Sequence, residues 1–341
     1  MSTQTLDTAS LTNYLTGRIP DFAGQVTAEK FAGGQSNPTF KVTAGDQQYV
    51  LRRKPPGELL ASAHAVDREF RVISALADTD VPVPKTFLLC EDESILGSMF
   101  YLMEYLEGRV FWDPTLPEVS SNAERSAIYD DMNRVLAALH KVDVDKVGLG
   151  DFGRPGNYFE RQVGRWTKQY RASETEHSEA METLMEWLPA NMPADDGANS
   201  LVHGDYRLDN LMFHPTEPRI IAVLDWELST LGHPLADLAY QVMAWQLPGD
   251  GSLRGLLEVN RADFGIPSDQ EYIDRYCERT GRSSIDNWNF YLVFCFFRLA
   301  AILQGIKKRA LIGTASSPEA EAKGAMVEGL AQFGVHYINQ A

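Results

Sequence analysis

Two carboxylates and one amide stand at a spacing that suits phosphoryl transfer. Residues 203–210 read HGDYRLDN, and Asp225 ends an apolar run fifteen residues after Asn210. Transfer of a phosphoryl group requires a side chain that orients the attacking hydroxyl, oxygen ligands for Mg²⁺, and positive charge near the phosphates. We therefore expect Asp205 to orient the hydroxyl or accept its proton, and Asn210 and Asp225 to bind the metal.

The residues between Asn210 and Asp225 predict a β-hairpin. Residues 211–213 can form a short strand, residues 214–219 contain a proline and predict a turn, and residues 219–224 predict the returning strand. A hairpin brings the outer ends of its two strands together, so Asn210 and Asp225 would meet. Taken singly, each residue suits an ordinary turn or a strand end, whereas the joint pattern favours a site.

The stretch 203–240, HGDYRLDNLMFHPTEPRIIAVLDWELSTLGHPLADLAY, resembles the catalytic and metal-binding loops of the aminoglycoside phosphotransferase and choline kinase family. Protein kinases, which are relatives of that family, carry HRDxxxxN and a later DFG. Here Gly204 stands in place of the Arg of HRD, and Asp225-Trp226-Glu227 stands in place of DFG. More closely, the stretch is similar to kinase-like domains that are fused to, or encoded beside, acyl-CoA dehydrogenases.

The resemblance implies an α+β, protein kinase-like fold with two lobes. Residues 1–103 would form a small antiparallel-sheet lobe that binds the nucleotide. Residues 104–341 would form a mainly helical lobe that carries the catalytic loop, the metal-binding loop and the acceptor site. The implied reaction uses ATP and Mg²⁺ and moves the γ-phosphoryl group to a hydroxyl of a small molecule, with GTP open as the alternative nucleotide.

The N-terminal part contains candidate phosphate-binding residues. A Gly-containing turn at residues 31–42 suggests that Gly34, Ser36 and Asn37 cover the phosphates, with a plain hairpin turn as the alternative. A later buried strand ends near Gly108 and resembles the hinge that connects kinase lobes. At that hinge, backbone groups of Glu104 and Leu106 would hydrogen-bond to the base.

A strand predicted at residues 48–54 ends in three cations. Alternation along a strand places Arg52 and Lys54 on one face and Arg53 on the other. By position, Arg52 resembles the family's phosphate-binding Lys, with Lys54 as the competing choice and a solvated strand end as the alternative. The resemblance also implies that Glu69, on a helix expected near residues 62–76, pairs with Arg52 and holds it at the phosphates.

Further residues near the catalytic loop have implied roles. Arg207 lies two positions after Asp205, where it would neutralise charge in the transition state, unless it pairs with Asp209 at the surface. The resemblance makes Asp237 the acid that accepts hydrogen bonds from the loop backbone, with a helix cap as the alternative. His203 is expected to pack within the loop and not to transfer protons.

Helices expected near residues 157–172 and 287–310 would build the acceptor site. Their mixture of aromatic and cationic residues favours an anionic or acyl-type hydroxylated acceptor over a polycationic aminoglycoside. Aromatic residues at helical spacing are otherwise typical of a core, and paired lysines of a solvated surface. The resemblance points to a hydroxyacyl compound or its CoA thioester. The residues concerned are Tyr158, Arg161, Arg165, Trp166, Tyr170, Arg298, Lys307 and Lys308.

Composition favours a soluble, cytoplasmic enzyme with no obligate protein partner. A chain of 341 residues with 44% hydrophobic residues can bury the cores of two lobes. No N-terminal segment has the pattern of a signal peptide, and the apolar segment 290–303 is shorter than a membrane span. The net charge of −16 argues against nucleic-acid or anionic-membrane binding, and three cysteines suggest free thiols.

Apolar periodicity predicts the helices of the second lobe. They are expected near residues 122–141, 157–172, 174–189, 235–247, 268–280, 287–310 and 318–337.

Two other classes of protein remain as alternatives. A metal-dependent hydrolase could bind Zn²⁺ or Mn²⁺ through a cluster of histidines and carboxylates. A catalytically silent module would bind ATP without turnover, an alternative that the Arg52 substitution favours and the joint presence of Asp205, Asn210 and Asp225 opposes. The hydrolase ligands would be His203, Asp205, His214, Asp225 and His233.

Overall fold

The structure, a computed structural model, describes residues 5–20, 22–31, 37–55, 65–249, 254–314 and 319–340. The chain divides into two compact units. The first unit contains Met1–Arg109 and Leu211–Ser229, and the second contains Val110–Asn210 and Thr230–Ala341. The predicted lobe boundary after residue 103 stays a prediction. The segment 211–229, which was predicted in the second lobe, belongs to the first compact unit.

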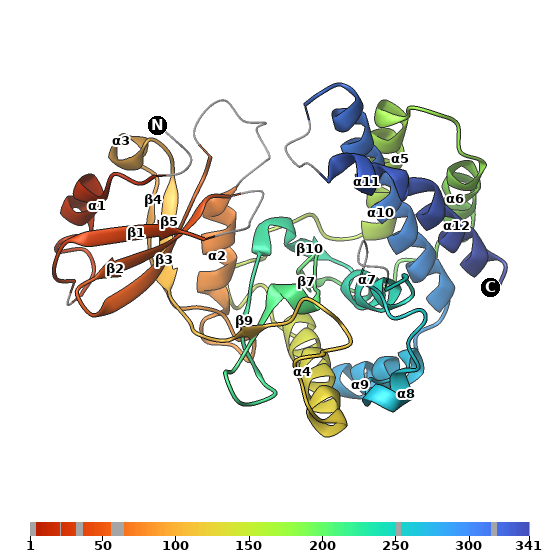
Figure 1. Cartoon of the computed structure of the whole chain (residues 1–341). Helices are drawn as coiled ribbons and strands as arrows, with labels where there is room; N and C mark the ends of the chain where they lie inside the picture. The colour runs from red at the N-terminus through yellow and green to blue at the C-terminus, as the bar shows by residue number, and fades with distance from the viewer. Residues whose placement is uncertain are drawn as a thin grey trace. The chain divides into compact units, whose positions relative to one another are not determined.

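An antiparallel sheet of five strands is the framework of the first unit (Figure 1). The strand order is β1-β2-β3-β5-β4, so that the hairpin of β2 and β3 lies in the middle. Ala44 pairs with Gln47 across the tight turn of this hairpin, where Gly45 has a φ of 59°. Such a left-handed backbone favours glycine. The strands are β1 (Val26–Lys30), β2 (Thr39–Ala44), β3 (Gln47–Arg53), β4 (Thr86–Cys90) and β5 (Phe100–Glu104).

Helix α1 (Thr8–Leu15) closes the hydrophobic core of this sheet. The Asp7 carboxylate accepts a hydrogen bond from the Ser10 N–H and so caps the helix. Leu11 and Leu15, one turn apart, are fully buried against the strands. This helix was not predicted from the sequence, because eight residues with only two buried positions give little periodicity.

Two further helices belong to the first unit. Helix α2 (Val66–Leu76) contacts β4 and β5, and α3 (Glu93–Leu96) follows β4. The apolar stripe of α2 is interrupted by one buried acid, Glu69.

The predicted hairpin between Asn210 and Asp225 is confirmed. Strands β8 (Leu211–Phe213) and β9 (Ile220–Val223) pair in antiparallel fashion, with Leu211 opposite Val223. Arg109 braces the turn by donating hydrogen bonds to two of its carbonyls. Asp225 follows β9 and opens a short 3₁₀ turn, η2 (Trp226–Leu228).

The second unit is mainly helical (Figure 1). A two-stranded sheet of β7 (Ser200–Val202) and β10 (Thr230–Gly232) flanks the predicted catalytic loop, which ends in the 3₁₀ turn η1 (Leu208–Asn210). The helices are α4 (Asn122–His140), α5 (Tyr158–Ser173), α6 (Glu179–Ala190), α7 (Leu235–Trp245), α8 (Arg261–Phe264), α9 (Asp269–Thr280), α10 (Trp288–Leu311), α11 (Ala320–Ala325) and α12 (Val327–Ile338).

Helix α10 is the central helix of this unit, because α5, α6, α7, α11 and α12 all contact it. By length and a mean hydropathy of 1.6 over 18 residues it could cross a membrane, but 78% of that window is buried within the protein. A buried helix of this kind is typical of a soluble core, so α10 gives only weak support to a membrane span.

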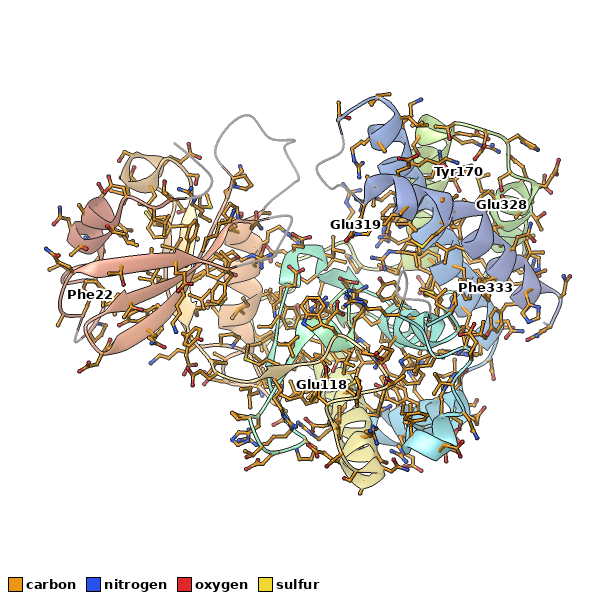
Figure 2. The ribbon with its side chains drawn as sticks, viewed as in Figure 1. Phe22, Glu118, Tyr170, Glu319, Glu328 and Phe333 are labelled. Carbon is orange, nitrogen blue, oxygen red and sulfur yellow. The ribbon has the colours of Figure 1, made fainter. Side chains whose placement is uncertain are left out.

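Two predicted helices have different boundaries in the structure. Helix α6 begins at Glu179, because the Ser178 hydroxyl caps it by accepting from the Met181 N–H. The helix predicted over 318–337 is two helices, α11 and α12, which meet at Met326. Figure 2 shows Glu328 and Phe333 on α12, and Phe333 stacks on Phe296 of α10 at 5.7 Å between ring centroids.

Candidate active site

Arg52 lies near the end of β3 and joins carboxylates from two other elements. Its Nε lies 2.8 Å from Glu69 Oε2 on α2, and its Nη2 lies 2.8 Å from Asp225 Oδ1 after β9. Glu227 Oε2 lies 3.9 Å from the same Nη2. We call these four residues the Arg52 cluster. The pairing of Arg52 with Glu69 that the sequence predicted is present.

Only one of the three cations at the end of β3 belongs to this cluster. Arg53 points to the other face of β3, where it is 1% exposed and lies 5.5 Å above the Phe40 ring. Lys54 lies beyond the strand, and its side chain makes no ion pair within the part of the chain that the structure describes. The geometry therefore favours Arg52 over Lys54 as the phosphate-binding residue.

Glu69 is buried, with 1% exposure, and has three polar partners. Besides Arg52, these are the Tyr101 hydroxyl at 3.1 Å and the Asn37 amide at 2.8 Å. Burial raises the pKa of Glu69 to about 7, and the charge of Arg52 opposes this rise. Asn37, a predicted phosphate contact, thus turns its amide nitrogen inward, while Gly34 and Ser36 lie outside the described residues.

The charges of the Arg52 cluster fit a divalent cation. Three carboxylates share one guanidinium, so the ionised cluster carries two excess negative charges. Carboxylate oxygens are the ligands that Mg²⁺ prefers. Asp225 is partly accessible, with a side chain 35% exposed, and its φ of 62° is a strained value typical of functional positions. Asp225 therefore suits the predicted metal role.

A cavity of about 360 Å³ lies at the end of β5. Met103, Val50 and Leu224 give it an apolar wall, and both predicted hinge residues, Glu104 and Leu106, line it. Among the described residues, the Leu106 N–H has no hydrogen-bond acceptor. An apolar cavity with a few free backbone groups suits a planar base.

The catalytic loop brings the predicted base and one predicted metal ligand together. The Asn210 amide nitrogen donates to the Asp205 carbonyl at 2.9 Å and to Asp205 Oδ2 at 3.0 Å. No described residue donates to the amide oxygen of Asn210, which is the atom that a metal would bind. Asn210 can therefore hold Asp205 and a cation at the same time.

Asp237, at the start of α7, holds the backbone of this loop. Its carboxylate accepts hydrogen bonds from the N–H groups of His203 at 2.6 Å and Gly204 at 2.8 Å, and it lies 3.3 Å from His140 Nε2. Burial alone would raise the pKa of Asp237, but these hydrogen bonds and nearby histidines outweigh it and lower the pKa. The supporting contact predicted for Asp237 is present.

The structure also shows the contacts of Arg207 and His203, the two other residues of the loop that have predicted roles. Arg207 Nη2 hydrogen-bonds to Asp209, and its Nε lies 3.6 Å from Asp205 Oδ1. His203 is fully buried, and its Nδ1 accepts the Asp205 N–H at 3.2 Å. The structure thus gives His203 a packing position, while a transition-state role for Arg207 stays a prediction.

With this geometry established, sequence comparison identifies the family. A profile of the phosphotransferase enzyme family, APH, matches residues 27–272. The chain belongs to this family. It is 50% identical over 326 residues to acyl-CoA dehydrogenase family member 10 of Mus musculus and 44% identical over 338 residues to family member 11 of Homo sapiens. These alignments cover 95% and 96% of this chain but only 30% and 43% of the relatives.

The resemblance to kinase-like domains associated with acyl-CoA dehydrogenases is therefore confirmed, and the α+β, kinase-like fold is confirmed by solved structures. A Ralstonia eutropha JMP134 protein, named as an aminoglycoside phosphotransferase, is 52% identical, with a TM-score of 0.92 over 99% of both chains. Choline kinase from Cryptosporidium parvum Iowa II shares the fold at 10% identity, with a TM-score of 0.67 over 98% of this chain and 96% of that chain.

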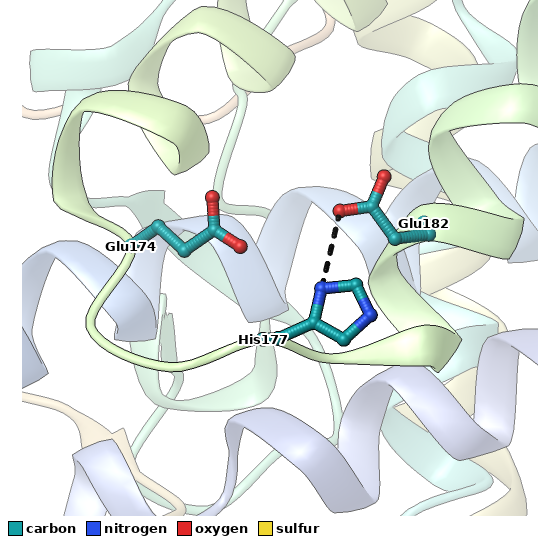
Figure 3. A group of neighbouring side chains, drawn as sticks. All are labelled: Glu174, His177 and Glu182. Atoms are coloured by element: carbon teal, nitrogen blue, oxygen red, sulfur yellow. Dashed lines mark ion pairs between the residues drawn. The ribbon is translucent and has the colours of Figure 1, made fainter.

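The structure gives no support to the hydrolase alternative. In the described ranges, one group of three metal-ligand side chains comes together, and it consists of Glu174, His177 and Glu182 (Figure 3). Arg171 pairs with both of these carboxylates, and the histidine is exposed. The predicted hydrolase ligands contribute nothing to this group, and His233 pairs instead with Asp196 at 3.2 Å.

Some residues expected at the acceptor site of this phosphotransferase belong to the core. Tyr170 is 1% and Trp166 is 9% exposed, as aromatic residues at helical spacing usually are. Lys307 pairs with Glu176. Arg161 and Arg165, by contrast, line an open groove of about 830 Å³ along α5, together with Lys168.

Two residues contact the catalytic loop that were not predicted to do so: Tyr240 had no predicted role, and Arg298 was expected at the acceptor site. The Tyr240 hydroxyl interacts electrostatically with the Asp205 carboxylate, and burial raises the Tyr240 pKa well above its usual range. Arg298 donates from Nη2 to the Gly204 carbonyl at 2.8 Å. A single charge within the apolar segment 290–303 of α10 was the available signal for Arg298, but its partner depends on tertiary packing.

Proposed function

We propose that this phosphotransferase is an ATP- and Mg²⁺-dependent kinase that transfers the γ-phosphoryl group to a hydroxyl of a small molecule. The observation that carries the proposal is the double hydrogen bond from Asn210 to Asp205. These bonds fix the Asp205 carboxylate beside the Asn210 amide oxygen, which accepts no hydrogen bond from the described part of the chain. That arrangement suits a base and a metal ligand and has no evident purpose in a plain turn.

The proposed roles follow from the chemistry of each side chain. Asp205 orients the acceptor hydroxyl and takes its proton, since an ionised carboxylate accepts hydrogen bonds. Arg52 and Arg207 supply positive charge to the phosphates. Asn210 and Asp225 would hold Mg²⁺, which when bound neutralises charge on the phosphates.

The cavity at the end of β5 supports nucleotide binding. Its apolar wall would contact the faces of the base, and Leu106 N–H with the Glu104 carbonyl would hydrogen-bond to the base edge. A phosphotransferase of the same fold, at 15% identity, is known in complex with ADP and hygromycin B, with a TM-score of 0.63. This likeness supports the fold of a nucleotide site, and the residues named here carry the proposal.

The acceptor is proposed to be a hydroxyacyl compound or its CoA thioester. Arg161, Arg165 and Lys168 line the α5 groove against one acid, Glu160, in a protein of net charge −16. Such a groove favours an anionic acceptor over a polycationic one. The names of the relatives, acyl-CoA dehydrogenase family members 10 and 11, support an acyl substrate.

A coupled ADP-release assay tests this function. Wild type and Asp205→Ala are incubated with Mg-ATP or Mg-GTP and a panel of hydroxyacyl-CoAs, free hydroxy acids, choline-like alcohols and aminoglycosides. We expect release that depends on a hydroxyacyl acceptor and disappears in the variant. Binding of Mg-ATP without release for any acceptor would favour the silent module, and ester cleavage without nucleotide would favour a hydrolase.

A further inference from the structure

Arg298 is a buried cation without an acidic partner. It is 8% exposed on α10, and no carboxylate in the described residues lies within ion-pair distance of its guanidinium. Removing a charge from water costs several kcal/mol unless other groups compensate. The neighbouring residues of α10 are apolar and buried, so a charge at this position calls for a functional explanation.

The compensating groups all belong to the surroundings of Asp205. Arg298 Nη2 donates to the Gly204 carbonyl at 2.8 Å. Its guanidinium lies 5.4 Å from the Tyr240 ring centroid and 5.9 Å from that of Trp166. Cation–π contacts of this kind stabilise a cation most when water is excluded.

Charged side chains bind both the N–H and the carbonyl of Gly204. Asp237 Oδ1 accepts the Gly204 N–H at 2.8 Å, while Arg298 binds the carbonyl. Gly204 has a φ of 83°, a conformation that side chains disfavour and that this pair of charges maintains. The next residue is Asp205, so the direction of its side chain depends on this peptide.

Tyr240 completes the connection. Its ring lies against Arg298, and its hydroxyl interacts electrostatically with the Asp205 carboxylate. Asp205 is thus held by Asn210 at Oδ2 and by Arg298 through the preceding carbonyl, and Tyr240 lies against Arg298 with its hydroxyl acting on the same carboxylate.

We propose that Arg298 and Tyr240 are positioning residues that fix the Asp205 carboxylate for phosphoryl transfer, Arg298 through the Gly204 carbonyl and Tyr240 through its hydroxyl. The proposal rests on the proposed kinase function. It assigns Arg298 to the geometry of the base and not to recognition of the acceptor, which the sequence had suggested.

The test compares Arg298→Met, Arg298→Lys and Tyr240→Phe with Gln304→Met. Gln304 is a matched control, because it is also a buried donor on α10 and bonds a backbone carbonyl, that of Ser173, at 2.7 Å. Each variant is measured by thermal unfolding, by steady-state kinetics with the acceptor found in the ADP-release assay, and by hydrogen exchange of residues 203–210.

We expect Arg298→Met to lower kcat about 10- to 100-fold, with KM for acceptor and Mg-ATP unchanged, and Tyr240→Phe to lower kcat about tenfold. Arg298→Lys should recover part of kcat, since an ammonium can also donate to the carbonyl. Exchange of residues 203–210 should rise in Arg298→Met. Gln304→Met should lose thermal stability but keep kcat and the exchange of this loop.

Two results would overturn the proposal. A rise in acceptor KM with kcat unchanged in Arg298→Met would make this residue an acceptor ligand. Unchanged kcat in Tyr240→Phe, with unchanged loop exchange in Arg298→Lys and Arg298→Met, would leave both residues with a packing role only. If wild type shows no turnover with any acceptor, the kinase function fails, and the exchange data alone then decide whether Arg298 holds the loop.

Discussion

Arg52 and Asp237 are charged side chains in two regions of the predicted active site, yet they are paired in opposite ways. Arg52 contacts other charged side chains, Glu69 and Asp225, at 2.8 Å each. Asp237 contacts backbone N–H groups of His203 and Gly204 and makes no contact with a cationic lysine or arginine in the described chain.

The difference indicates two kinds of task. A cluster of side-chain charges with an excess of carboxylates can change partners when a cation or phosphate arrives. Water cannot reach backbone N–H groups that bind a buried carboxylate, so the loop that carries these groups keeps one conformation. We therefore expect changes in the Arg52 cluster to alter nucleotide and metal affinity, and changes at the Asp205 loop to alter the rate of transfer.

Asp205→Ala should have the largest effect, because removal of a general base typically costs 10²- to 10⁴-fold in rate. We expect kcat to fall by about that factor while affinity for Mg-ADP, measured calorimetrically, stays within a few fold. Asp205→Asn serves as the matched variant, since it keeps the hydrogen-bonding shape and removes the charge. Full turnover in either variant would contradict the role of Asp205.

Asp225→Asn should be next, because a bound metal contributes several kcal/mol of charge stabilisation in phosphoryl transfer. We expect the Mg²⁺ concentration for half-maximal activity to rise and Mg-ADP affinity to fall. Glu227→Gln is the control, because it removes the same charge at 3.9 Å from Arg52 without removing a predicted ligand. An equal loss in both variants would mean that net charge, and not the Asp225 ligand, controls metal binding.

Sequence reasoning anticipated the contacts that depend on local order along the chain. Asp205, Asn210 and Asp225 lie within 21 consecutive residues, and the hairpin between them follows from turn and strand patterns. Asp237 lies one short strand later. The pairing of Arg52 with Glu69 came from the resemblance, although a buried acid within the apolar stripe of α2 is a signal that periodicity contains.

The remaining contacts depend on packing between distant segments. Arg298 lies 94 positions after Gly204, and only the arrangement of α10 places it at that carbonyl. The spacing of Trp166 and Tyr170 suits both the wall of a ligand site and a hydrophobic core. Helix α5 packs against α10, and both side chains are buried in the core. The late start of α6 depends on the Ser178 cap, which the apolar pattern does not specify, whereas α12 begins after Met326 without a side-chain cap.

Glu69→Gln provides a pH test of the Arg52 cluster. The folded pKa of Glu69 is about 7 and its ordinary value is 4.5, because burial opposes ionisation. Between these values the folded protein holds a proton that the unfolded chain has lost, so the free energy of unfolding falls as pH rises. The total fall is on the order of 3 kcal/mol. The variant should lack this fall in urea titrations between pH 5 and 8, and identical slopes would contradict the raised pKa.

Arg52→Lys should have the smallest effect and separates Arg52 from Lys54. The guanidinium reaches Glu69 and Asp225 from two different nitrogens, and a single ammonium cannot reproduce that fork. We expect Mg-ADP affinity to fall about tenfold, or about 1.4 kcal/mol, with kcat nearly unchanged. A fall in kcat at unchanged affinity would break the distinction between the two regions.

Lys54→Met is the matched change for this test. Lys54 follows Arg52 by two positions, and its side chain makes no ion pair in the described residues, so its loss should leave affinity within about twofold. Lys54→Met removes a positive charge from this strand end, whereas Arg52→Lys keeps one, so a loss of affinity confined to Arg52→Lys cannot come from a general loss of positive charge. A larger effect at Lys54 would transfer the phosphate contact to that residue and would leave Arg52 with the single task of holding Glu69 and Asp225 together.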